Sequence, residues 1–190
     1  MSEPVRTRVA DPETLKAITH PLRRRILREI DRYGTVNSAT LAEKLGQNTG
    51  TLSYHLRQLE RFGYIEDAPD RGNGRERWWR RTSTNWQTAD PTTLDEKGRA
   101  LVEQVTRTRL AEDARDINGL VDNLATHWDR DHPWTTWSRA GTFLSPAEFR
   151  AFHDEYLALL HRYHHRADTA PPDAHPIRIR LYMYPEPDDD

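Results

Sequence analysis

The stretch TLSYHLRQLERFGYIED, residues 51–67, constrains the fold more than any other part of the chain. Its apolar residues recur at steps of four, three and three, which places them on one face of a helix: Leu52, Leu56, Leu59 and Phe62. The helix then meets Gly63, a typical stop, and the pattern changes to the alternation of a strand. The polar face carries Arg57 and Arg61 but no acid before Glu60. We expect a negatively charged partner against that face.

Three further helices are predicted ahead of this one. The first, in DPETLKAIT, begins with an aspartate cap followed by proline, and the pair HP interrupts it because a residue before proline avoids helical geometry. The second, PLRRRILREIDRY, ends at Gly34. The third, in NSATLAEKLG, has Asn37 or Ser38 as its cap and Gly46 as its stop. A turn of about four residues, QNTG, then leads into the fourth helix.

A hairpin follows the fourth helix. After the alternating YIED, the segment APDRGNGRE is rich in glycine, proline and aspartate and predicts a turn. RWWRRT is the returning strand, since tryptophan and threonine favour extended structure. Alternation should bury one of Trp78 and Trp79 and leave the other at the edge. This order of elements predicts a winged helix-turn-helix over residues 1–82.

The rest of the chain divides into three parts. We predict a polar linker at residues 83–92, a long helix at 93–131 that dimerises, and a C-terminal unit at 132–190. Apolar residues in the long helix alternate at spacings of three and four, which suits packing against a partner helix: Ala114, Ile117, Val121, Leu124 and Trp128. The predicted fold class is therefore mainly α with small β: a winged helix-turn-helix, a long dimerisation helix and a small α+β C-terminal unit.

The C-terminal unit has the pattern of strand, helix and strand. Its extended segments are WTTWSRAGTF, residues 134–143, and IRIRLYMY, residues 177–184, where apolar and polar residues alternate. Ser145 and Pro146 open the helix between them. Six aromatic and aliphatic residues are predicted to form the buried face of that helix: Phe149, Phe152, Tyr156, Leu159, Leu160 and Tyr163.

The charges of the two halves differ in sign. Residues 1–82 hold 16 Lys and Arg against 11 Asp and Glu, a balance of +5, whereas residues 83–190 hold 12 against 19, a balance of −7. A basic first half favours a polyanion partner for that half.

No apolar run approaches the roughly 20 residues that span a bilayer, and no secretion signal opens the chain, so we expect a soluble cytoplasmic protein without a membrane partner. The absence of cysteine excludes disulfides and thiolate metal sites.

Duplex DNA fits the pattern of the fourth helix, because the major groove accepts an α-helix whose N-terminal residues meet the base edges. The helix begins near Asn48, which is counted among the DNA-binding residues, and the residues predicted to face the bases are Thr49, Gly50, Thr51, Ser53 and Tyr54. Arg57, one turn further on, is better placed for a phosphate. The hairpin turn adds Arg71, Asn73 and Arg75 for phosphates or the minor groove. The competing interpretation of these arginines is a polar face that contacts only water, and His55 is expected to pack beneath the helix.

Four segments carry a family resemblance: HPLRRRILREI, LAEKLG, TLSYHLRQLERFGYIE and GRERWWR. They closely resemble the ArsR-like winged-helix transcriptional regulators of bacteria, over residues 12–82, and the run Ser53-Tyr54-His55-Leu56 is the most specific part. The resemblance implies a homodimer that binds a palindromic double-stranded DNA operator and represses transcription until an effector arrives. It also implies DNA contact by Thr49, Gly50, Thr51, Ser53, Tyr54 and the wing arginines.

Two features depart from the family pattern. Metal-sensing members use a cysteine pair near the recognition segment or a His/Asp set on the terminal helices, and this chain has no cysteine. The chain also continues through residues 83–190, where the small members of the family soon end. Metal sensing is therefore not carried over from the resemblance.

Two residue groups in the second half suggest small ligands. HRYHHRAD offers His161, His165 and Asp168 as zinc or nickel ligands, but on a helical wheel they project into water, so a solvated face competes and no metal cofactor is predicted. Four tryptophans bracket the junction between the long helix and the C-terminal unit: Trp86, Trp128, Trp134 and Trp137. They could line a pocket for an apolar effector, or they could simply fill the core of a small unit.

No enzyme motif is present in the sequence, neither a phosphate-cradling glycine loop nor a nucleophile elbow nor a zinc-binding helix. The predicted function is therefore a sequence-specific transcriptional regulator and not an enzyme. Two alternatives stay open: a winged-helix protein-interaction module without specific DNA binding, and a metal-responsive sensor that uses the C-terminal histidines.

Overall fold

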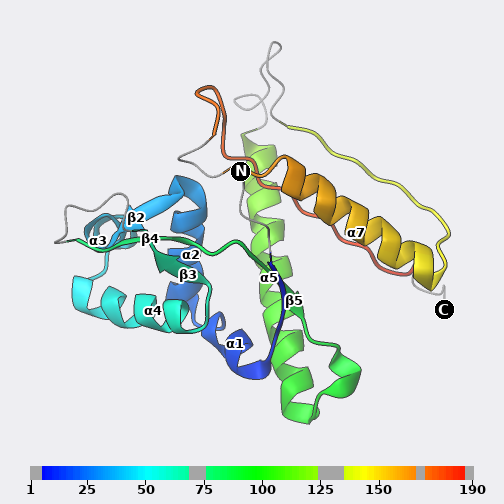
Figure 1. The fold of residues 1–190 in the computed structure, drawn as a ribbon, viewed down its shortest axis with the longest axis horizontal. Coiled ribbons are helices and arrows are strands. Elements are labelled where there is room, and N and C mark those ends of the chain that lie inside the picture. The colour runs from blue at the N-terminus through cyan, green and yellow to red at the C-terminus, as the bar shows by residue number, and fades with distance from the viewer. Residues whose placement is uncertain (1–5, 69–75, 124–134, 166–169, 187–190) are drawn as a thin grey trace.

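A computed structural model of the protein describes residues 6–68, 76–123, 135–165 and 170–186 (Figure 1). The fold is mainly helical with small sheets, as predicted. The described elements, in chain order, are β1 (Arg6–Ala10), α1 (Pro12–Ala17), α2 (Pro21–Tyr33), β2 (Thr35–Asn37), α3 (Ser38–Leu45), α4 (Thr49–Arg61), β3 (Ile65–Asp67), β4 (Trp78–Arg81), β5 (Thr84–Thr88), the 3-10 turn η2 (Pro91–Thr93), α5 (Glu96–Asp122) and α7 (Pro146–Arg162).

The helices of the N-terminal domain begin and end where the sequence predicts. Asn37 caps α3 and Asn48 caps α4, each side chain accepting a hydrogen bond from a backbone N–H in the first turn. Gly34 and Gly46 follow α2 and α3 with φ of 74° and 62°, conformations that residues with a Cβ avoid. The chain can therefore turn sharply between helices, and α2, α3 and α4 enclose one apolar core.

A three-stranded sheet in the order β2-β4-β3 completes the winged helix. Both neighbours of β4 are antiparallel to it, and Val36 and Asp67 face Trp79 from either side. Trp79 is 3% exposed whereas Trp78 is half-buried. The prediction that one of these tryptophans is buried is confirmed, and the buried one closes the core beneath the wing.

The start of the predicted linker differs from expectation. Thr84–Thr88 is not a free polar connection but the strand β5, which pairs in parallel with β1. Within it, Trp86 packs on the core, and its ring centroid lies 5.1 Å from that of Tyr64. The pairing partner comes from the other end of the domain, so no local pattern indicated it.

The long helix α5 packs along the winged domain (Figure 1). Val102 and Val105 are buried in the core, next to α1. About two turns further on, Glu112 accepts a hydrogen bond of 2.8 Å from Arg24 of α2 and also lies 3.6 Å from Arg28. Among the residues that the structure describes, no helix has both the length and the apolar content needed to cross a bilayer.

The two strands predicted in the C-terminal unit are not formed. Residues 135–143 and 177–184 run as extended chain, and no described backbone pairs with either of them. The second segment is held through its side chains instead: Arg178 pairs with Asp116 and Arg180 Nε lies 2.7 Å from Asp113 Oδ1. An alternating pattern produces a strand only where a second backbone lies alongside, and these acids of α5 offer side chains only.

The predicted helix between these segments is present as α7, but its apolar face is not buried as expected. In the described part of the chain no residue of α7 is buried. Four of the six predicted core residues are strongly exposed: Phe149, Phe152, Leu159 and Tyr163. The reason is that α7 makes no extensive contact with another described helix or strand.

Candidate nucleic-acid interface

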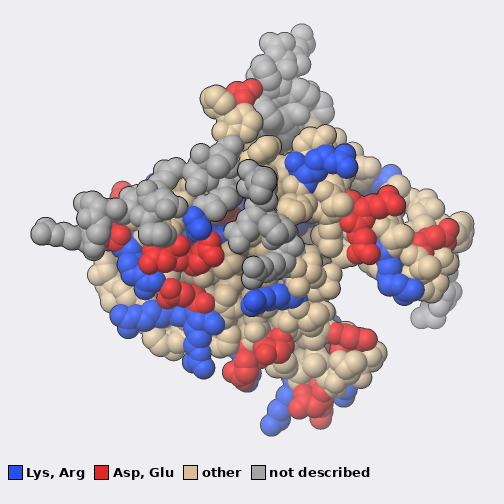
Figure 2. Space-filling view, in the orientation of Figure 1, with Lys and Arg blue, Asp and Glu red and all other residues tan. Residues whose placement is uncertain are grey.

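The helix α4 is anchored on one side and open on the other. Leu52, Leu56 and Leu59 are fully buried, whereas Tyr54 is 60% exposed and Arg57 also faces solvent. Figure 2 shows Lys and Arg side chains along this edge of the molecule, where Figure 1 places α4, with Asp and Glu side chains beside them. The amphipathic pattern of the sequence therefore produces a fixed helix with a free polar face.

The N-terminus of α4 is suited to a negatively charged partner. Asn48 Oδ1 accepts a hydrogen bond of 2.8 Å from Thr51 N, which leaves other N–H groups of the first turn without an intrahelical partner. The first turn carries no acid, so the positive end of the helix dipole is not neutralised there. Thr49 and Gly50 are both exposed at this end. Phosphate oxygens and base acceptors are the groups that such an end attracts.

Two of the predicted contact residues also have a local role. Ser53 is half-buried, and its hydroxyl donates a 2.8 Å hydrogen bond to Thr49 O, so only its lone pairs remain for another partner. A Cβ at Gly50 would lie 3.3 Å from Asn48 Oδ1 and would press on the helix cap. Glycine at this position therefore protects the cap, whether or not a backbone of DNA approaches it.

A groove of about 360 Å³ lies beside α4, between the start of α3 and the base of the wing. The predicted residues Thr49, Ser53 and Arg57 line it together with Arg77 of the wing and the buried Trp79. The open polar face of α4 thus continues into a hollow instead of ending at a flat surface. The wing residues Arg71, Asn73 and Arg75 lie outside the described residues.

Arg77 is a residue of this groove that the sequence analysis missed. Its guanidinium pairs with Glu60 at 2.7 Å and with Asp67 at 3.1 Å, and it lies 4.2 Å from the ring centroid of Trp79. These contacts tie the wing to the end of α4 and fix the angle between them. The signal was the alternation of the returning strand, which places Arg77 and Trp79 on the same side.

A histidine pair lies behind α4. His55 is buried as predicted, its ring centroid is 4.4 Å from that of His20, and its Nδ1 has no hydrogen-bond partner among the described residues. His20 caps α2, with Nδ1 accepting from Leu22 N at 3.1 Å, and can do so only when Nδ1 is unprotonated. Burial lowers the pKa of His55, and His20 and Arg23 lower it further. Burial also lowers the pKa of His20.

We expect the domain to lose stability as the pH falls. Both folded-state pKa values lie below the ordinary value, so the unfolded chain takes up protons first, and the stability present above about pH 6.5 is lost progressively below it. His20→Asn keeps a capping side chain but does not titrate. Thermal melts between about pH 8 and about pH 5, on either side of the imidazole pKa, should show a smaller fall in Tm for His20→Asn than for the wild type. Equal falls in Tm for the two proteins would show that His20 does not contribute to the loss of stability at low pH.

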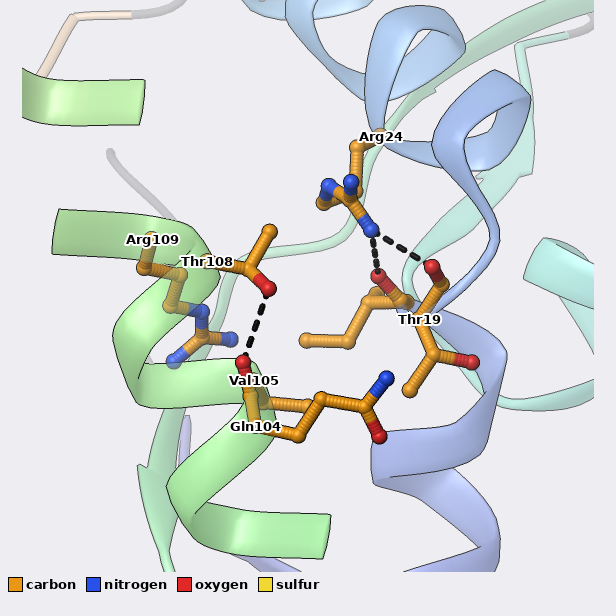
Figure 3. Close-up of a pocket in the computed structure, with 7 residues that line it drawn as sticks. Thr19, Arg24, Gln104, Val105, Thr108 and Arg109 are labelled. Carbon is orange, nitrogen blue, oxygen red and sulfur yellow. Dashed lines mark hydrogen bonds between the residues drawn. The ribbon is translucent and has the colours of Figure 1, made fainter. Parts of the chain in front are cut away.

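The tryptophans proposed as an effector pocket do not form a described cavity. Trp86 belongs to the core and Trp137 is 53% exposed, while Trp128 and Trp134 lie outside the described residues. A separate cavity of about 20 Å³ lies between α1, α2 and α5, where Arg24 donates to the carbonyls of Ile18 and Thr19 (Figure 3). That volume suits about one water molecule, not an organic effector. The four-tryptophan pocket stays a prediction.

The histidine metal set stays an open alternative. His161 lies on the last turn of α7 and His165 is exposed just beyond it, while Asp168 lies outside the described residues. Within the described ranges no three His, Cys, Asp or Glu side chains come together as metal ligands.

Comparison with known proteins assigns the domain that carries this interface. Residues 18–66 match the family model of a helix-turn-helix domain. The match runs from the end of α1 to β3 and so contains α4 with the whole of its exposed face. It covers about a quarter of the chain. No curated protein matches the chain.

Several solved structures are similar to the protein at low identity. Reduced HlyU from Vibrio cholerae is 20% identical, with 50% of this chain and 84% of that chain covered and a TM-score of 0.33. RV1404 from Mycobacterium tuberculosis is 20% identical, with 79% of each chain covered and a TM-score of 0.35. The transcriptional regulator Tm0710 from Thermotoga maritima is 16% identical, with 80% and 87% covered and a TM-score of 0.33. At these TM-scores the similarities do not extend the assignment beyond the helix-turn-helix.

Proposed function

We propose that the protein is a sequence-specific DNA-binding transcriptional regulator. One observation carries the proposal: the helix-turn-helix presents α4 with its apolar side fully buried and its N-terminal half exposed, capped and free of acids. A positive helix end with Thr49, Tyr54 and Arg57 outward complements the major groove in both shape and charge.

The contacts divide by the chemistry of the side chains. Thr49 and Tyr54 lie at the base edges, where hydroxyl groups donate and accept, and Gly50 allows the DNA to approach the helix. Asn48, Thr51 and Ser53 support that end of the helix and offer their remaining hydrogen-bonding atoms. Arg57 faces a phosphate from the rim of the groove, and the wing residues Arg71, Asn73 and Arg75 contact phosphates or the minor groove. These contacts make the affinity for DNA steeply dependent on salt.

The protein acts as an ArsR-like homodimer that represses transcription from a palindromic operator. Two copies joined through α5 place their α4 helices in successive major grooves, roughly 34 Å apart. The side chains of Leu110, Ile117 and Val121 on α5 support this assembly, because they are apolar and about half exposed among the described residues. We also propose that a small-molecule effector causes the protein to release the operator.

Genomic fragments retained by the immobilised protein test the function. We expect sequencing of these fragments to give a discrete palindrome, with two half-sites separated by one helical turn of DNA. The Tyr54→Ala variant on a parallel column is the control, since it should retain the same fragments less well. Smooth coverage by both proteins would favour the alternative, a winged-helix module that binds other proteins and not specific DNA.

The wing makes a separate prediction about salt. Replacing Arg71 and Arg75 with alanine removes two cations per protomer, so affinity should fall for every DNA sequence and the slope of log K against log salt should flatten by about 0.9 for each lost phosphate contact. Fluorescence anisotropy over a salt series measures the slope. Arg150→Ala, an exposed arginine on α7, is the matched control and should leave the slope unchanged. An unchanged slope in the double variant would exclude the wing from phosphate contact.

A further inference from the structure

The helix α7 is well formed but uncovered. Ser145 and Glu148 make a reciprocal capping box, and Pro146 occupies the first turn. Nevertheless no residue of the helix is buried in the described part of the chain. Most helical stability in proteins comes from the packing of an apolar face, so a helix of this kind indicates a missing neighbour.

The uncovered side of α7 is a regular apolar stripe. Its members are separated by three, four, three and four residues, the spacing of a coiled-coil seam: Phe149, Phe152, Tyr156, Leu159 and Tyr163. Four of them are 42–70% exposed, and only Tyr156 is half-buried. We call these five residues the α7 stripe.

A second stripe of the same kind lies on α5. Leu110, Ala114, Ile117 and Val121 are separated by four, three and four residues. The three larger side chains are 44–53% exposed. They lie on a different side of the helix from Val102 and Val105, which are buried in the core. We call these four residues the α5 stripe.

The two stripes do not cover each other within one chain. The segment 177–184 runs beside α7 toward the C-terminus, and α7 diverges from α5 (Figure 1). Arg178 and Arg180 fix this segment to Asp116 and Asp113 of α5, and Tyr182 Oη also donates to Asp113. The chain therefore holds its own two helices apart.

The exposed area of the two stripes matches what a stable dimer needs. A large apolar side chain presents roughly 200 Å² when free, so exposures near one half leave about 100 Å² on each. The seven exposed members of both stripes together give on the order of 700 Å² per protomer, close to the ~800 Å² that each partner buries in a stable interface.

We propose that the α7 stripe of each protomer packs on the α5 stripe of a second copy of this chain. One two-fold rotation makes the contact twice and covers both stripes on both protomers, whereas contact between the two α7 helices would leave the α5 stripes bare. This deepens the homodimer of the proposed function by naming its surface, and it assigns the C-terminal unit a role in assembly.

Cross-linking tests the contact directly, because the chain has no cysteine of its own. Ile117→Cys and Phe152→Cys are placed on two differently tagged copies that are expressed together and oxidised without DNA. The expected product is the mixed disulfide between the two tags. Arg150→Cys, on the exposed polar side of α7, replaces Phe152→Cys in the control and should give no such product. Disulfides only between identical tags, or none at all, would overturn the proposal.

Light scattering provides a second measurement that does not depend on disulfide geometry. The wild type should have twice the 22.2 kDa mass of one chain, and Phe152→Glu with Leu159→Glu should have the mass of one chain. Both side chains are exposed in the single chain, so the variant should keep its fold by circular dichroism. Arg150→Glu should stay dimeric. If the variant with both glutamates is still a dimer, the proposed contact is refuted. Operator binding is measured separately, and its result bears only on the proposed function.

Discussion

Replacing Tyr54 with alanine should weaken operator binding by at least about thirtyfold while leaving the domain folded. A side chain at a base edge contributes about 1–3 kcal/mol, and a palindrome loses this contribution in both half-sites. Tyr54 is 60% exposed on α4, so its removal leaves no cavity in the core. Gel shift or anisotropy with the palindrome, alongside a thermal melt, separates the loss of binding from any loss of stability.

Two variants control this experiment. Tyr33→Ala removes a tyrosine that is also exposed but lies at the end of α2, and it should bind the operator as the wild type does. Tyr54→Phe keeps the edge-to-face contact with His55 at 5.2 Å and removes only the hydroxyl group, so it tests the hydrogen bond alone. Wild-type affinity in Tyr54→Ala would exclude this side chain from the interface.

Replacing Arg24 with alanine should give the largest loss of stability among the surface-charge variants, roughly 3 kcal/mol of unfolding free energy. Its guanidinium donates to the carbonyl of Ile18 at 3.0 Å and to that of Thr19 at 2.6 Å (Figure 3). It also donates to Glu112 at 2.8 Å. The arginine thereby joins the end of α1, the start of α2 and the middle of α5. Without it, the carboxylate of Glu112 loses its shortest ion pair and both carbonyls lose a donor.

Urea unfolding measures this effect, and the neighbouring Arg25 offers the control. Arg25 is exposed, and its one described hydrogen bond, to Leu45 O, is 3.4 Å long, so Arg25→Ala should cost well under 1 kcal/mol, as exposed polar contacts do. Arg24→Lys keeps the charge, but its single nitrogen cannot replace the separate Nε and Nη1 contacts of the guanidinium, and its stability should fall between those of the two alanine variants. Equal stability of Arg24→Ala and Arg25→Ala would show that the triple contact contributes nothing.

The N-terminal helices could be predicted because their signals are local. Each has an apolar stripe at helical spacing, a capping side chain such as Asn37 or Asn48, and a glycine at its end. The same reasoning identified the exposed face of α4, since the burial of Leu52, Leu56 and Leu59 requires the opposite face to point outward. These features depend on residues within a few positions of one another, and no distant partner is needed to establish them.

Features that depend on distant partners were missed or misassigned. Pairing of β1 with β5 turned part of the predicted linker into a strand, and the partner lies at the other end of the domain. The reverse occurred at residues 177–184, where a clear alternating pattern produced no strand because no described backbone pairs with it through hydrogen bonds. Side-chain contacts of Arg178 and Arg180 with α5 hold that segment instead.

The sequence alone determined where the helices of the winged domain begin and end, which face of α4 is polar, and that the first half is the basic one. Only the tertiary structure decided that Arg77 lines the groove beside α4, that Arg24 joins three helices, and that the described part of the chain leaves the apolar side of α7 exposed. The physical reason is the distance along the chain over which each kind of interaction acts. Caps and periodicity act between residues a few positions apart, whereas burial and ion pairs depend on which distant elements the folded chain brings together.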